Sequence, residues 1–160
     1  MAATNIVQSK NLGPQDLSLS VTQALPASGA NVTTGYLDLQ AVGPISDAWT
    51  DGVLAVTFPN LPENTVAGGI TVAIQAAAPL LTQGASAIAP LTPLPGAFAT
   101  VLTLTLAGVA GTGTAAQKMY AELPLDSTGL PYQFYQFLIT TTAGINTLGE
   151  PVTIAWEDRS

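Results

Sequence analysis

Residues that could act as a general base are scarce in this chain. The 160-residue sequence has no histidine and no cysteine, and its only basic residues are Lys10, Lys118 and Arg159. Histidine is the commonest general base and the commonest transition-metal ligand, so a nucleophilic serine would have to rely on a lysine. Lys118 falls at the start of an expected strand, with no serine near it in the sequence. We therefore expect no Ser–Lys hydrolase and, more broadly, no enzyme.

Two pairs of carboxylates remain as candidates for catalysis or metal binding. Asp47 with Asp51, and Glu122 with Asp126, could be considered for glycoside cleavage, which needs two carboxyl groups. Both pairs fall at expected strand ends or turns, where acidic side chains bond to the local backbone. We therefore expect no catalytic residue, no cofactor and no metal. A calcium site built from Asp47, Asp51 and backbone carbonyls stays open as an alternative, although these residues lack the spacing of an EF-hand loop.

The charge balance limits the possible partners. Ten acidic residues against three basic ones give a formal charge of -7, whereas nucleic-acid binders need several Lys or Arg residues. Anionic membranes repel such a chain for the same reason. Charged residues make up 8% of the sequence, against roughly 25% in ordinary globular proteins. Either a neutral polar β surface or a surface buried against other proteins accounts for this composition. We expect no nucleic-acid or membrane partner.

Alternation of apolar and polar residues with a period of two dominates the sequence and predicts β-strands. The expected strands are residues 17–21, 36–40, 53–58, 70–75, 101–106, 118–123, 132–141 and 152–156. About eight short strands with turn signals between them predict an all-β jelly-roll sandwich. An immunoglobulin-like sandwich is the alternative. We expect residues 17–160 to form this single domain.

Two long segments fall outside the expected strands. Residues 1–16 predict an extended N-terminal arm, and they lack the pattern of a signal peptide. Residues 76–99 predict a long proline-rich loop, since proline is excluded from helix interiors and central strands. The prolines are Pro79, Pro90, Pro93 and Pro95. The loop is too apolar for free disorder, so we expect it to contact a partner or its own sheet.

Five segments form a pattern that is shared with a known family. They are Gly35-Tyr36-Leu37-Asp38-Leu39, Gly69 to Gln75, Leu123-Pro124-Leu125, Tyr132 to Thr142 and Val152 to Trp156. This pattern resembles that of the small cement proteins that decorate podovirus-type phage heads. The resemblance spans residues 33–156 and is one of pattern rather than of motif. It departs from the family at Gln133 and Gln136, where arginine is often expected.

The resemblance implies a structural virion protein, made in the host cytoplasm, that decorates and stabilises the outer face of a phage capsid. Its partners would be the major capsid protein and further copies of itself, as trimers or dimers. An acidic protein suits the outside of a shell, away from packaged DNA, and clamping neighbouring subunits stabilises the intact shell by linkage. The expected contact residues are Ile6, Val7, Leu12, Leu91, Leu94 and Phe98. Deleting residues 1–12 should leave the fold intact and weaken assembly.

Other functions stay open at this point. A host- or glycan-binding module of tail-fibre or adhesin type would need an exposed ligand site, and a carbohydrate-active enzyme would need a carboxylate pair in a cleft. A β-sandwich with no assignable partner is a further possibility. The aromatic residues of one strand, Tyr132, Phe134, Tyr135 and Phe137, are expected to pack in the core rather than to form a ligand platform.

Overall fold

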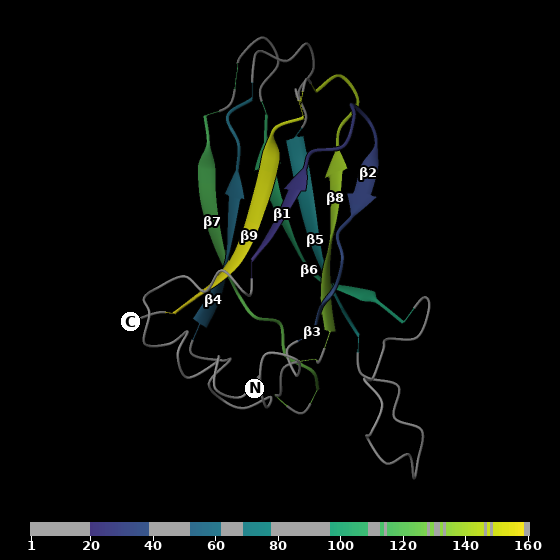
Figure 1. Cartoon of the computed structure of the whole chain (residues 1–160), viewed down its shortest axis with the longest axis vertical. Coiled ribbons are helices and arrows are strands. Elements are labelled where there is room, and N and C mark those ends of the chain that lie inside the picture. Colours follow the sequence, from purple (N-terminus) through teal and green to yellow (C-terminus); the bar gives the residue numbers. More distant parts are fainter. Residues whose placement is uncertain are drawn as a thin grey trace.

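The protein is built from two facing β-sheets. The structure, a computed structural model, describes residues 20–38, 52–61, 69–77, 97–108, 113, 115–127, 129, 132, 134–145, 147 and 149–158. These residues form strands and turns and include no helix. The sheets are antiparallel and enclose one hydrophobic core (Figure 1). The predicted all-β sandwich is therefore confirmed.

One sheet has four strands in the order β1-β9-β4-β7. Its strands are β1 (Val21–Ala24), β4 (Gly52–Phe58), β7 (Gln117–Glu122) and β9 (Pro151–Asp158). β4 lies at the centre, where Leu54 is opposite Ala121 of β7 on one side and Trp156 of β9 on the other. β1 and β7 are consequently the edges of this sheet.

The other sheet has five strands, with the order β2-β8-β5-β6 and with β3 also paired to β8. Its strands are β2 (Asn31–Thr33), β3 (Leu37–Asp38), β5 (Gly69–Ala77), β6 (Ala99–Ala107) and β8 (Phe134–Thr141). β2 and β3 pair with successive parts of β8, so they occupy one position in the sheet. The nine segments therefore fill eight strand positions, which agrees with the number predicted from the sequence.

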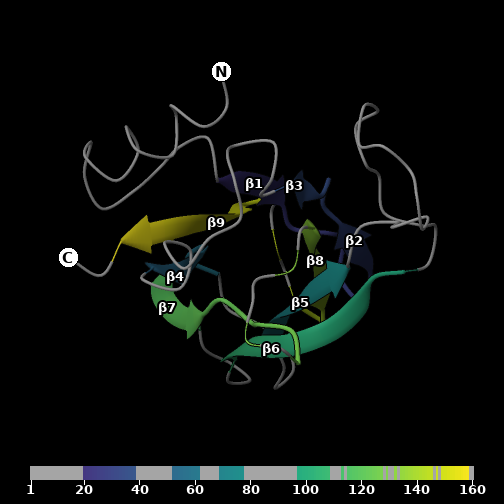
Figure 2. The same ribbon diagram turned by 90° about the horizontal axis from the view of Figure 1, so that it is seen from below.

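Strand pairing is nested along the chain. β1 pairs with β9, β2 with β8, β4 with β7, and β5 with β6. Figure 2 shows the result from one end of the sandwich, where β6 and β7 end the two sheets on the same side. These two edge strands therefore flank the same side of the sandwich.

The core consists of every second side chain along the strands, as the alternation in the sequence predicts. Val56, Ile74 and Phe137 come from β4, β5 and β8, and each of them is fully buried. Burial of one such side chain contributes about 1.5–3 kcal/mol. The intervening side chains of each strand therefore face outward and form the two outer faces of the sandwich.

Several strand boundaries differ from the predicted ones. β1 begins at Val21, where the predicted strand ended. β2 was not predicted, because three residues are too few to show alternation. The break predicted over residues 76–99 is shorter, since β5 extends to Ala77 and β6 begins at Ala99. The predicted arm at residues 1–16 and most of the predicted loop lie outside the described residues and stay predictions.

Candidate interaction surfaces

The outer face of the five-stranded sheet carries no charged side chain on its three longest strands. We call this surface the neutral face. It comprises Thr71, Ala73 and Gln75 of β5, Thr100, Thr103 and Thr105 of β6, and Gln136, Leu138 and Thr140 of β8. Within the sheet, the only charged residue is Asp38 of β3. A chain with a net charge of -7 therefore presents a face that is uncharged over its three longest strands.

A row of hydrogen bonds crosses the neutral face. Gln136 Nε2 donates to Gln75 Oε1 at 2.8 Å, and Gln75 Nε2 donates to Thr100 Oγ1 at 3.4 Å. The amides thus satisfy part of one another's hydrogen-bonding capacity on three adjacent strands. Because unsatisfied polar groups are costly to bury, this pairing lowers the cost of covering the face with another protein.

Three aromatic rings lie at one end of the neutral face. Phe134 is the next outward residue of β8 after Gln136. Its ring meets that of Tyr36 edge-on, with centroids 5.4 Å apart. Tyr36 also contacts Phe98, with centroids 6.3 Å apart. Tyr36 is 46% exposed, so the cluster adds an accessible aromatic ring beside an uncharged surface.

Only one of the six predicted contact residues falls in the described part of the chain. Phe98 is half-buried beside Tyr36 and next to the neutral face. Ile6, Val7, Leu12, Leu91 and Leu94 lie outside the described residues. The neutral face itself was not predicted. Its signal was present in the sequence as a lack of charge in residues 70–75, 101–106 and 132–141, but only the pairing of these strands joins them into one surface.

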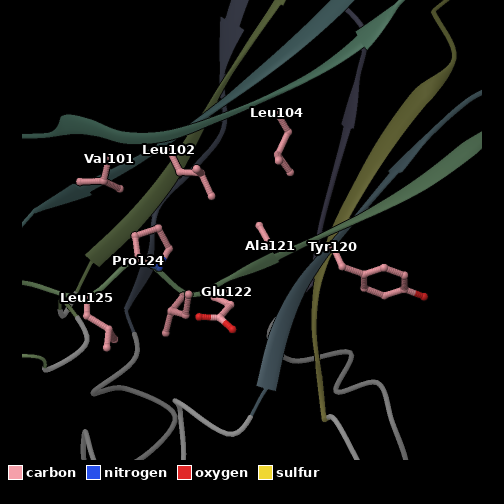
Figure 3. Close-up of a pocket in the computed structure, with 9 residues that line it drawn as sticks. Val101, Leu102, Leu104, Tyr120, Ala121, Glu122, Pro124 and Leu125 are labelled. Carbon is pink, nitrogen blue, oxygen red and sulfur yellow. The ribbon is translucent and has the colours of Figure 1, made fainter.

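The second surface is an apolar groove between β6 and β7, with a volume of about 520 Å³. We call it the β6–β7 groove. Figure 3 shows Leu102 and Leu104 of β6 pointing towards Ala121 and Pro124, while the ring of Tyr120 points away from them. The other lining residues are Val101, Glu122, Leu123 and Leu125. Its lining is mainly aliphatic, with Tyr120 and Glu122 as the two residues that have polar side chains.

Lys118, the base considered for a serine nucleophile, is held in its charged form. Its ammonium group forms an ion pair with Glu157 and lies 5.4 Å from the centre of the Tyr120 ring. The hydrogen bond to Glu157 raises the pKa of Lys118 above its ordinary value. A general base must be deprotonated near neutral pH, so this environment opposes the role that a hydrolase would need.

The carboxylates do not form a recognisable site in the described residues. Glu122 is exposed on β7, and Asp126 lies in a turn where its carbonyl oxygen accepts the Gly129 N–H at 3.0 Å. Asp47 and Asp51 lie outside the described residues. Among the residues that the structure describes, no group of three carboxylates is placed to hold a metal ion.

Tyr135 ties the aromatic strand to the segment that follows β7. Its hydroxyl donates to the Pro124 carbonyl at 2.6 Å and accepts the Tyr132 N–H at 2.9 Å. Burial raises the pKa of this hydroxyl well above its ordinary value. Tyr135 and Phe137 belong to the core and Tyr132 packs against it, so core packing is confirmed for these three residues. Phe134 is also fully buried, but it packs against Tyr36 at the end of the neutral face.

Comparisons with known proteins add no family to this description. A scan against protein-family models finds no matching family, and a search of curated proteins finds no similar sequence. Across the described segments, no helix has the length and apolarity that a membrane span needs.

Proposed function

We propose that this protein is a non-catalytic structural component of a virion, which decorates the outer face of a phage capsid and binds the shell through its neutral face. The observation that carries the proposal is the lack of charge on that face in a chain of net charge -7. Burying an unpaired charge is costly, and charged residues are depleted in interface cores. A β face whose long strands carry no charge is therefore better suited to contact with another protein than to exposure to water.

The nested pairing of strands supports a jelly-roll connectivity for the body. In such a fold two four-stranded sheets are joined by Greek-key connections, an architecture that viral shell proteins use. The eight strand positions and the pairs β1·β9, β2·β8, β4·β7 and β5·β6 are compatible with that connectivity. The resemblance to phage cement proteins, which rests on the sequence pattern, points to the same architecture.

The distribution of charge supports one orientation on the shell. Lys118, Glu122 and Glu157 all belong to the four-stranded sheet, where they alternate with residues of the core. Hydrated charges are best left in water. The four-stranded sheet would accordingly face solvent, while the five-stranded sheet faces the shell. Neighbouring shell subunits held by one bound protein would be harder to separate, because binding favours the intact shell.

The test places one carboxylate on each outer face. Leu138 lies near the middle of the neutral face, opposite Thr33 and Ala73, and Leu138→Glu should reduce binding at least tenfold. Thr22→Glu, on an exposed threonine of β1, is the matched control and should bind like the wild type. Binding is measured by cosedimentation with capsid shells of the virus that encodes the chain, from which the protein itself has been removed.

Folding of both variants is checked by thermal denaturation, and Thr140→Glu on the same face serves if Leu138→Glu does not fold. Equal binding of neutral-face and control variants would contradict the proposal. So would a wild-type protein that does not sediment with the shells.

A glycan-binding module is the second candidate function, and the exposed ring of Tyr36 is the observation that favours it. Aromatic faces are common parts of sugar sites because they present an apolar surface with a polar tip. This function predicts glycan-array binding that Tyr36→Ala abolishes. Shell binding that survives Tyr36→Ala, together with an empty array, would favour the structural function.

A further inference from the structure

The four sheet edges of the described structure are protected to very different degrees. β1 has four residues and β2 has three, and such short strands offer little backbone for pairing with another chain. β7 carries Lys118 and Glu122, and charged side chains are a common protection of edges. β6 has nine residues, Ala99–Ala107, with neither a charge nor a proline. Among the described strands it pairs with β5 alone.

We propose that two copies of this chain join through β6, pairing antiparallel across a twofold axis that is perpendicular to the five-stranded sheet. The inference deepens the proposed function. It rests on that function only for the role of the two joined neutral faces, which is to bind the shell. An axis in this direction keeps both neutral faces on the same side. The two copies would then present one continuous uncharged surface to the shell.

A second copy is the occupant that the charge distribution favours. Chains of net charge -7 repel each other, and across a twofold axis each surface meets the same surface of its partner. Pairing two copies through β7 would partly bury the charged side chains of Lys118 and Glu122, which is costly. β6 brings only alanine, threonine, valine and leucine together, so it is the long edge at which two copies can meet without burying a charge.

The apolar side chains beside this edge support the same occupant. Val101, Leu102 and Leu104 of β6 are only half-buried, and they line the β6–β7 groove. Leu125, another lining residue, is 39% exposed. A copy seated along β6 would cover part of this surface. Apolar burial would then add to the backbone hydrogen bonds of the new strand pair.

Joining two copies has a consequence for shell binding. Two linked neutral faces bind as a bivalent unit, and the second contact forms at a high effective concentration once the first is made. A dimer should therefore stay on the shell longer than a single copy would, without any additional kind of contact.

The first test introduces a lysine, a residue that natural proteins place on edge strands to prevent pairing with another chain. Thr105→Lys places a lysine on β6, and Thr22→Lys places the same change on the short edge strand β1. Both threonines are exposed, and both variants change the net charge equally. Light scattering after size exclusion, over a range of concentrations, should show dimers for the wild type and Thr22→Lys and monomers for Thr105→Lys. A dimeric Thr105→Lys protein, with unchanged dissociation, would overturn the inference.

The second test uses the lack of cysteine in the chain. Thr100, Thr103 and Thr105 are changed singly to cysteine, and each variant is oxidised and examined for covalent dimers. Antiparallel pairing across a twofold axis predicts efficient cross-linking at the position nearest the axis and little at Thr22→Cys on β1. Equal cross-linking at all four positions would indicate random collision and overturn the inference.

Failure of the inference and failure of the proposed function are distinguishable. Leu138 lies on β8, two strands away from the β6 edge, so Leu138→Glu should lose shell binding and keep the dimer. A wild-type chain that is monomeric at every concentration, yet sediments with shells, would overturn only the β6 pairing. A wild-type dimer that does not bind shells would overturn only the proposed function.

Discussion

The two sheets of this protein share a core and differ in what they show to the outside. Both inner faces supply apolar side chains to one buried cluster. On the outside, the four-stranded sheet carries Lys118, Glu122 and Glu157, whereas the longest strands of the five-stranded sheet carry no charge. Since both sheets supply the core, the need to bury a core does not explain why the two outer faces differ in charge.

The largest expected effect separates the inner and outer faces of β8. Phe137 is fully buried, and Phe137→Ala should lower the free energy of unfolding by about 3–5 kcal/mol, because it leaves a cavity. Leu138, the next residue, faces outward, and Leu138→Ala should cost about 1 kcal/mol or less. Urea denaturation of both variants measures the difference. Similar losses would mean that the neutral face is as tightly packed as the core.

A smaller effect is expected where the five-stranded sheet is tightest. A Cβ on Gly69 would overlap the carbonyl oxygen of Leu106, so Gly69→Ala should separate the start of β5 from β6 and cost about 1–3 kcal/mol. Gly35→Ala is the control, since a Cβ there would meet no atom within 4 Å. Thermal denaturation measures the stability of the two variants. Equal stability of the two would show that β6 is held less closely than the structure indicates.

Tyr135 should make stability depend on pH in the alkaline range. Burial raises the pKa of its hydroxyl above the ordinary 10.0, so above about pH 10 the unfolded chain releases a proton that the folded chain retains. The contribution of this hydroxyl to stability is therefore fully present below pH 10 and is lost as the pH rises above that value. Tyr135→Phe should cost about 1 kcal/mol at neutral pH and flatten this decline. A decline of the same slope in wild type and variant would assign it to other groups.

The smallest effect belongs to the charged sheet. Lys118→Gln removes the ion pair with Glu157, but the lysine side chain is 40% exposed, and pairs of this kind contribute about 1 kcal/mol or less. The loss should shrink further at high salt. Denaturation at low and high ionic strength measures it. A loss comparable to that of Phe137→Ala would show that the ion pair matters to the fold as well as to the surface.

Most of the strands were predicted correctly from the sequence. The segments that became β5 and β6 were found because apolar side chains recur at every second position. The segment that became β8 shows little alternation and was predicted as a central strand, which its pairing with β2, β3 and β5 confirms. β2 was missed, because its three residues form a strand only by pairing with β8. The ion pair between Lys118 and Glu157 depends on the order of strands, which alternation does not contain.

The neutral face illustrates the same limit for function. Each of its strands is visibly poor in charge, yet Gln75 and Gln136 are distant in sequence and form their hydrogen bond only because β5 and β8 are neighbours. The predicted contact residues were instead chosen from the arm and the loop, and of these only Phe98 can be placed beside the face. The face became recognisable as one surface only once the strand order was known.

Coverage of the neutral face by the shell is the central claim of the proposed function. Hydroxyl-radical footprinting of the protein, free and bound to shells, tests that claim by comparing Leu138 on the neutral face with Tyr120, which is 57% exposed on β7. We predict that Leu138 becomes protected on binding while Tyr120 is labelled as before. Protection of Tyr120 with continued labelling of Leu138 would contradict the account.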